Sequence, residues 1–131
     1  MNNKLTYIHL FTDASGETHF AEKEFAFKRL DHVENRESIT VHEISGVHRA
    51  ILYKLAKGAV EDWHTAPRKQ LGCVIHGMAD ITASDGEVRR LRPGSVILID
   101  DTTGKGHITK HVGDEDHIAM MIPLGESEDR I

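Results

Sequence analysis

The sequence has a single cysteine, no long apolar run and no gathering of positive charge. Cys73 is the only cysteine among the 131 residues, which excludes a disulfide within the chain and is typical of a protein in a reducing cytosol. No apolar run reaches the roughly 18 residues that a membrane-spanning helix needs. The N-terminal sequence MNNKLTYIHLF lacks the long apolar stretch and small-residue cleavage site of a signal peptide. These absences predict a cytoplasmic protein with no membrane partner.

Charge is mixed along the whole sequence. There are 16 Lys and Arg against 21 Asp and Glu, which gives a formal net charge of -5. A nucleic-acid surface needs clustered Lys and Arg to neutralise phosphates, so we expect no nucleic-acid partner. The apolar share of 39% and the charged share of 28% are those of an ordinary globular chain. A chain of this length predicts one domain, residues 1–131, with one sizeable core.

Short strand-like segments separated by turn signals run through the sequence. Glycine-containing turns occur at Asp85-Gly86 and Pro93-Gly94, because glycine accepts a positive φ. Strands are expected at 5–11, 24–30, 38–44, 47–55, 71–75, 79–83, 88–91, 95–99, 107–112 and 117–122. Only residues 50–59 compete as a helix. Many short strands at spacings of roughly ten residues predict an all-β sandwich or closed barrel.

One segment has the spacing of a known family motif. From Gly58 to Gly77 the sequence reads GAVEDWHTAPRKQLGCVIHG. Gly58 is followed by five residues, His64-x-Ala66, three residues, Gln70, six residues and Gly77. This resembles the first motif of the cupin superfamily, which runs glycine, five residues, His-x-His, three or four residues, Glu, six residues, glycine.

A second cupin motif has a counterpart further along the chain. That motif begins with a glycine, here Gly94, and carries a histidine followed four residues later by an asparagine. His107 takes the histidine position and His111 stands where the asparagine would be, after a loop about two residues longer than usual. The resemblance implies an RmlC-like jelly-roll barrel, also called a double-stranded β-helix. We expect the barrel core at about 47–123, N-terminal strands at about 1–46, and a homodimer.

The resemblance also implies where the site lies and how it departs from the family. The usual cupin site binds a divalent metal such as Fe, Mn, Ni or Zn through three histidines and a glutamate. Here Ala66 has no donor atom and Gln70 offers a neutral amide oxygen, so the ligands that remain are His64, Gln70 and His107. Two imidazoles and an amide bind metal more weakly than the full set. One divalent transition metal and a metal-free barrel therefore remain alternatives.

The residue types suggest roles for the other groups around this motif. His64 and His107 are the candidate catalytic residues, as metal ligands or as an acid and base. The candidate substrate-binding residues are Arg68, Gln70 and His111, and a guanidinium pairs bidentately with a carboxylate or phosphate. His111 shares a strand face with His107, and its orientation decides whether it joins the site.

Two functions follow for a small polar metabolite as ligand. One is a small cupin enzyme of the lyase, isomerase or dioxygenase type. The other is a barrel that binds or senses the ligand without metal and without turnover.

Four further residues have expected roles that the structure can check. Asp100 or Asp101 is placed to orient a histidine, or else to cap a polar turn. Cys73 lies in an apolar run and is expected to be buried. Trp63 precedes His64 and is expected to pack against the barrel wall.

Overall fold

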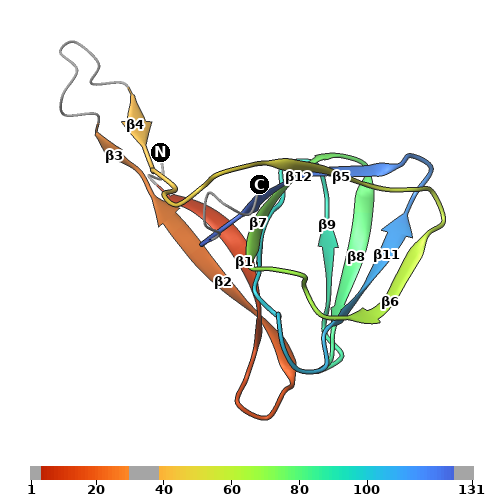
Figure 1. The fold of residues 1–131 in the computed structure, drawn as a ribbon. Coiled ribbons are helices and arrows are strands. Elements are labelled where there is room, and N and C mark those ends of the chain that lie inside the picture. Colours follow the sequence, from red (N-terminus) through yellow and green to blue (C-terminus); the bar gives the residue numbers. More distant parts are fainter. Residues whose placement is uncertain (1–3, 30–38, 126–131) are drawn as a thin grey trace.

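The computed structural model describes residues 4–29 and 39–125, and all of their regular structure is β-strand (Figure 1). The strands are β1 (Lys4–Thr12), β2 (Thr18–Ala26), β3 (Lys28–Arg29), β4 (Thr40–Val41), β5 (Ile51–Leu55), β6 (Val60–His64), β7 (Gln70–His76), β8 (Met78–Ala83), β9 (Val88–Leu91), β10 (Val96–Ile99), β11 (His107–Val112) and β12 (His117–Pro123). Within the described residues there is no helix able to cross a membrane.

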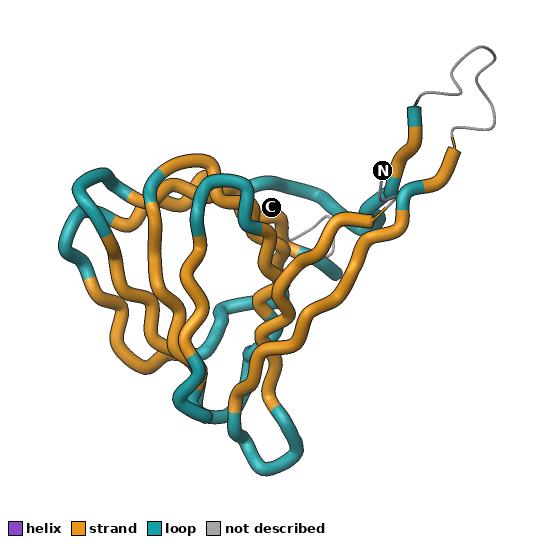
Figure 2. Tube along the Cα trace, turned by 180° about the vertical axis from the view of Figure 1, so that it is seen from behind, coloured by secondary structure: helices purple, strands orange, loops and turns teal. Residues whose placement is uncertain are grey.

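Two sheets form the body of the protein. A six-stranded sheet has the order β2-β1-β10-β7-β12-β5, and a four-stranded sheet has the order β6-β11-β8-β9. The sheets curve toward each other around a common interior, while β3 and β4 form a small separate ribbon that projects from one end (Figures 1 and 2). Neighbours in each sheet come from distant parts of the chain, as in β10-β7-β12-β5. This arrangement is an all-β jelly-roll barrel, as the strand spacing and the motifs predicted.

Strand alternation decides which side chains fill the interior. In β8 and β10 every second residue is buried, which is the period-2 pattern of a strand with one face on a core. The core is made by Leu10, Ala66, Val74, Ile81, Ala83, Leu91, Ile97 and Ile99. These branched and small side chains come from both sheets, so the two sheets share a single core.

The N-terminal strands are part of the barrel wall. β1 pairs in parallel with β10, with Leu10 opposite Ile99, and Leu10 is completely buried. β2 then pairs antiparallel with the whole length of β1 and forms one edge of the sheet. β1 and β2 therefore belong to the same six-stranded sheet as β10 and β7.

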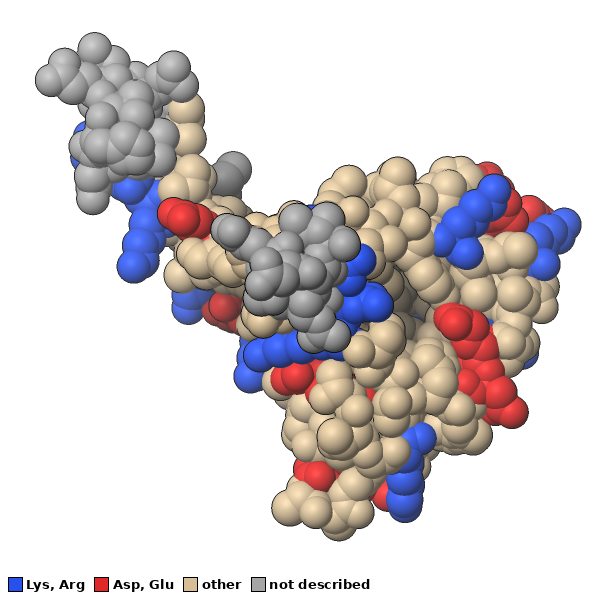
Figure 3. Space-filling view, viewed as in Figure 1, with Lys and Arg blue, Asp and Glu red and all other residues tan. Residues whose placement is uncertain are grey.

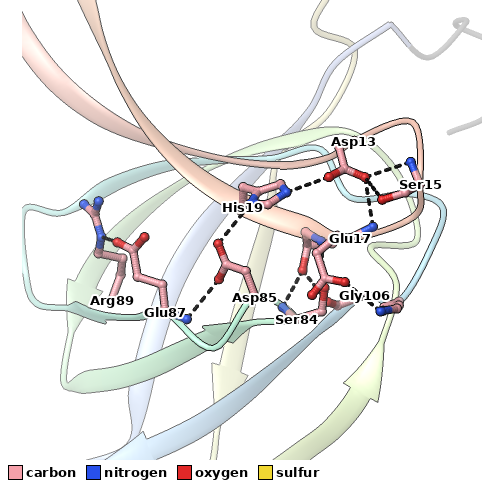
Figure 4. Close-up of polar contacts among 11 residues, drawn as sticks. Asp13, Ser15, Glu17, His19, Ser84, Asp85, Glu87, Arg89 and Gly106 are labelled. Carbon is pink, nitrogen blue, oxygen red and sulfur yellow. Dashed lines mark hydrogen bonds and ion pairs between the residues drawn. The ribbon is translucent and has the colours of Figure 1, made fainter.

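Polar contacts join two hairpin turns at one end of the barrel (Figure 4). The β1–β2 turn supplies Asp13, and the β8–β9 turn supplies Asp85. His19 lies between them, with Nε2 2.7 Å from Asp13 and Nδ1 2.9 Å from Asp85. The hydrogen bonds with Asp13 and Asp85 raise the pKa of His19. Buried Thr18 links the same turns, because its N–H donates to the Ser84 hydroxyl and its own hydroxyl accepts the N–H of Ser84. The Thr18 hydroxyl also donates to the carbonyl of Gly106, in the loop before β11.

Several strand predictions need correction. The segment 50–59 is not a helix, since β5 occupies Ile51–Leu55 and β6 follows after a turn. β6 was missed as a separate strand, and β2 begins at Thr18, six residues before the expected start at Glu24. The strand expected at 38–44 is only Thr40–Val41. Leu30 and Ser38, which ended and began two expected strands, lie outside the described residues.

Two predictions about side-chain burial are also wrong. Cys73 is exposed, because its neighbours Gly72 and Val74 take the inward positions of β7 and leave Cys73 on the outer face. Trp63 is 50% exposed rather than packed against the wall. It lies on β6, an edge strand of the four-stranded sheet in which four of the five residues are exposed. Apolar character alone did not tell which face of either strand points inward.

Candidate functional site

The interior of the barrel holds a cavity of about 180 Å³. Most of its wall is apolar and comes from both sheets. Val74, Ile81, Leu91 and Ile97 are among the apolar lining residues. Polar side chains gather where β6, β7 and β11 meet. The lining there is formed by His64, Arg68, Gln70, His107 and Thr109. The cavity therefore has an apolar body and a polar end.

His64 ends β6 and is held by a backbone contact. Its Nδ1 lies 2.7 Å from the carbonyl oxygen of Asp62, so Nδ1 donates this hydrogen bond. Gly106 allows β11 to approach at this point. It has a φ of 76°, and a Cβ there would overlap the carbonyl group of His64. The glycine before His107 thus brings the two histidine-bearing strands together.

His107 begins β11 and is oriented by a buried carboxylate. Its Nδ1 lies 2.5 Å from Oδ2 of Asp101, which is 0% exposed, and His107 itself is 3% exposed. His107 pairs with His64 across the strands, and their ring centroids are 4.4 Å apart. The backbone carbonyl of Asp101 also accepts the amide N–H of Ala66. Of the two roles open to Asp101, the structure shows the orienting one.

Gln70 and Arg68 complete the polar end. Gln70 is buried at the first position of β7, and its Oε1 lies 3.4 Å from Nη1 of Arg68. Arg68 is half-buried on the loop between β6 and β7 and lines the cavity. Its guanidinium gives this end of the cavity a permanent positive charge.

The structure thus brings His64, Gln70 and His107 to one cavity inside a jelly-roll barrel, at the positions of both motifs. This is the jelly-roll barrel fold that cupins have. Similar solved structures include a cupin 2 conserved barrel domain protein from Salinispora arenicola, with 17% identity, a TM-score of 0.48 and 81% of each chain covered. KdgF from Halomonas sp. has 24% identity and a TM-score of 0.47, with 69% of this chain and 79% of that chain covered.

A conserved protein of unknown function from Streptococcus pyogenes, SPY1581, has 22% identity and a TM-score of 0.47. That match covers 60% of this chain and 65% of the other, just under two thirds of its length. No protein-family model matches the sequence, and the search of curated proteins finds no match. These likenesses concern the cupin fold and not an activity.

His111 is not part of the cavity lining. It is buried, and both of its ring nitrogens are used by the backbone. Nδ1 accepts the N–H of Gly58 at 3.0 Å, and Nε2 lies 2.5 Å from the carbonyl of Glu115, to which it donates. His111 therefore ties β11 to the turns at its far end, and the structure does not bring it to His64 and His107.

Three ionisable residues of the cavity lining were missed by the sequence reasoning. His117 begins β12, is 1% exposed, and lines the cavity together with Tyr53 and Glu61. The Tyr53 hydroxyl donates a short hydrogen bond to Glu61, while desolvation, followed by that bond, raises the pKa of Tyr53. The available signal was alternation, because His117, Ala119 and Met121 share one face of their strand.

The donor atoms present do not fit a resident divalent metal. Ala66 lines the cavity without a donor atom, and the Gln70 oxygen lies beside the Arg68 guanidinium, whose charge repels a cation. Among residues 4–29 and 39–125 no three His, Cys, Asp or Glu side chains converge as a ligand group. Two imidazoles, those of His64 and His107, remain at this end of the cavity, whereas catalytic zinc sites, for example, use three protein ligands.

Proposed function

We propose that this cupin binds a small organic acid in its barrel cavity and uses no resident metal to do so. The observation that carries the proposal is the division of the cavity. Arg68, His64 and His107 lie at one end, and most of the remaining lining is apolar, with Tyr53, Glu61 and His117 as its ionisable members. A ligand with an anionic head and an apolar body matches both parts.

The polar end suits an anion for electrostatic reasons. Arg68 is charged at every physiological pH and offers paired N–H donors to a carboxylate. His64 and His107 each commit Nδ1 to an oxygen of the protein, which fixes the ring and leaves Nε2 for a ligand. Within the described part of the chain, neither Nε2 has a hydrogen-bonding partner. In the space-filling view, Lys and Arg atoms flank one side of a hollow, with Asp and Glu atoms on the other (Figure 3).

The size of the cavity limits the ligand. A volume of about 180 Å³ is below the roughly 300–1,000 Å³ of a drug-sized site. It is close to the roughly 150 Å³ apolar cavity that accommodates benzene. We therefore expect a metabolite with a carbon skeleton of about six atoms in addition to its acid group.

The Asp101–His107 pair favours a second candidate function, acid–base catalysis on the same ligand. A buried carboxylate that orients an imidazole is the arrangement of a general base. His107 would take a proton from the carbon next to a carbonyl group as the C–H electron pair delocalises onto that carbonyl. The imidazolium then returns the proton to the same or a neighbouring carbon. This completes an isomerisation, which needs no co-reactant. Of the expected enzyme types, only an isomerase is completed by such proton transfers alone, since a lyase must also break a second bond and release a leaving group.

The test is direct titration with butanoate, pentanoate, hexanoate and benzoate, followed by calorimetry and by amide chemical shifts. We expect binding of the longer or aromatic acids, with shifts at β6, β7 and β11. Arg68→Gln should weaken binding about tenfold, because one charge-assisted hydrogen bond is lost. Arg90→Gln is the matched control, since Arg90 pairs with Asp80 on the four-stranded sheet and does not line the cavity. Absence of binding for every acid at millimolar concentration contradicts the proposal.

The catalytic candidate has its own readout. Incubation of a bound acid in deuterated water, followed by NMR, reports exchange of the proton next to the carboxyl or a neighbouring carbonyl group. We expect exchange with the wild type and none with His107→Asn, in which the base is absent. If the acids and their 2-oxo analogues bind but show no exchange, the binding function stands and the proposed isomerase activity is contradicted.

A further inference from the structure

A carboxylate lies in the cavity lining away from Arg68. Glu61 is on β6, three residues before His64, which is roughly 10 Å along a strand. Glu61 lines the cavity and is also exposed, so its carboxylate lies at the mouth of the cavity, where a ligand can reach it. In a regular strand, residues three apart point to opposite faces, yet Glu61 and His64 both line the cavity.

A β-bulge in β6 accounts for this orientation of Glu61. On β11, His107 and Thr109 are two residues apart and share the cavity face. Their partners on β6, His64 and Glu61, are three residues apart, so β6 has one extra residue between the two pairs. A bulge of this kind re-aims a side chain and is frequent next to functional sites. The bulge therefore turns Glu61 inward, where strict alternation would place it on the outer face.

The protein itself uses only part of the hydrogen-bonding capacity of Glu61. The Tyr53 hydroxyl on β5 donates to Oε1 of Glu61, and this contact joins the edge strands of the two sheets. The pKa of Tyr53 is raised, so the hydroxyl keeps its proton as the donor. In the part of the chain that the structure describes, Glu61 has no ion-pair partner and its Oε2 accepts no hydrogen bond. A carboxylate oxygen therefore remains available to a ligand.

The carboxylate and the guanidinium lie at different levels of the barrel. Arg68 contacts Gln70 at the start of β7. Tyr53, which holds Glu61, lies across β12 from Val74, four residues along β7 from Gln70. Four residues are roughly 13 Å of strand. The described side chains of Glu61 and Arg68 form no ion pair with each other, so opposite charges lie apart on the lining of one cavity.

We propose that Glu61 binds an ammonium group of the ligand, so that the cavity takes an ω-amino acid with its carboxylate at Arg68 and its amino group at Glu61. This proposal rests on the proposed binding of an organic acid and names the class of that acid. An ammonium group suits Glu61 better than a neutral donor, because a charge-assisted hydrogen bond is about twice as strong as a neutral one. The cavity volume limits the chain to about four to six carbons.

The test uses butanoate, pentanoate and hexanoate, each beside its ω-amino derivative, together with the α-amino derivative of hexanoate. Calorimetry at low salt should show about fivefold tighter binding of one ω-amino acid than of its parent, the upper range for a partly exposed ion pair. The α-amino isomer should show no such gain, because its two charged groups are adjacent. In about 1 M NaCl the preference should fall below about twofold, since salt screens exposed charges.

Glu61→Gln separates the charge of Glu61 from its contact with Tyr53. The glutamine keeps an amide oxygen for the Tyr53 hydroxyl but carries no charge. The preference for the ω-amino acid should be lost, while the affinity for the parent acid stays within about twofold. Glu24→Gln is the matched control, because Glu24 pairs with Lys4 outside the cavity lining, and it should leave the preference unchanged.

A second readout uses the wild type alone. The ¹³C shift of the Glu61 carboxylate should move with the ω-amino acid and not with its parent. If neither the acids nor the amino acids bind, the proposed function fails. If the acids bind but no ω-amino acid is preferred, or if Glu61→Gln keeps the preference, this inference is overturned while the binding function stands. Glu61 then serves only to join the two sheet edges through Tyr53.

Discussion

The histidines of the cavity and the histidine between the hairpin turns use the same ring in opposite ways. His64 and His107 each have one nitrogen held by the protein and one directed to no protein partner within the described residues. His19 has both nitrogens against carboxylates, those of Asp13 and Asp85. Only a doubly protonated ring donates to both acceptors, so His19 is a charged connection between turns. Under the proposed function, the number of uncommitted nitrogens distinguishes a ligand-binding histidine from a structural one.

His111 sharpens the comparison because it lies on the same strand as His107. The two residues share a face of β11, and both are buried. His111 uses both nitrogens on backbone groups, whereas His107 uses one on a carboxylate. The position that sequence reasoning placed in the site is thus structural by the same criterion as His19.

The largest expected effect comes from restoring the family's ligand types at the cavity end. Ala66→His together with Gln70→Glu would supply three imidazoles and a carboxylate around the cavity. We expect affinity for Zn²⁺ or Mn²⁺ to rise about a thousandfold, or about 4 kcal/mol. Calorimetry and elemental analysis of protein made without a histidine tag measure it. Wild-type protein should contain far less than one metal per chain. An unchanged affinity in the double variant would mean that these positions do not converge.

The next effect concerns the buried pair that orients His107. Asp101→Ala leaves the Nδ1 of His107 buried without its carboxylate, and loss of one partner of such a buried pair costs about 3 kcal/mol. Urea unfolding followed by circular dichroism measures the free energy of unfolding. The control is Asp100→Ala, whose partner His9 lies 3.0 Å away in a partly buried contact, and which should cost about 1 kcal/mol. Equal losses in the two variants would contradict a special role for Asp101.

Replacement of His111 separates structure from ligand binding. His111→Leu removes two backbone hydrogen bonds and should lower the free energy of unfolding by about 2 kcal/mol. Affinity for the acid probes at low temperature should stay within about twofold of the wild type. A tenfold loss of affinity in a folded His111→Leu protein would restore His111 to the site.

The smallest expected effect is the pH dependence that His19 confers. The folded-state pKa of His19 is raised above its ordinary value of 6.5. Its contribution to stability is therefore complete below about pH 6.5 and is lost as pH rises through the folded-state pKa. Wild-type protein should exceed His19→Gln in Tm by more at pH 5.5 than at pH 8.5. A difference that is the same at both pH values would show that the contact with Asp13 and Asp85 does not depend on the ring's charge.

The homodimer implied by the resemblance stays a prediction, for which the molar mass in solution is the measurement. The absence of nucleic-acid and membrane partners, and a cytoplasmic location, likewise stay predictions.

The local sequence pattern was enough to predict the barrel and most of the residues at the polar end of the cavity. Turn signals and period-2 alternation predicted β9 and β11 to the residue, because both features act over a few neighbouring positions. The spacing from Gly58 to Gly77 predicted that His64 and Gln70 belong to the site. Such spacing depends on the lengths of the strands and of the turn between them, which are local features. His107 followed from the second motif.

The tertiary structure decided which of two equivalent faces points inward and which nitrogen of each histidine remains free. Alternation says that Cys73 and Val74 face opposite ways, but only the packing of two sheets makes Val74 the buried one. His111 and His117 are both inward on their strands, yet the turns around them satisfy one and leave an atom of the other unsatisfied. These differences depend on contacts between residues distant in sequence, such as Gly58 with His111. No local pattern encodes such contacts.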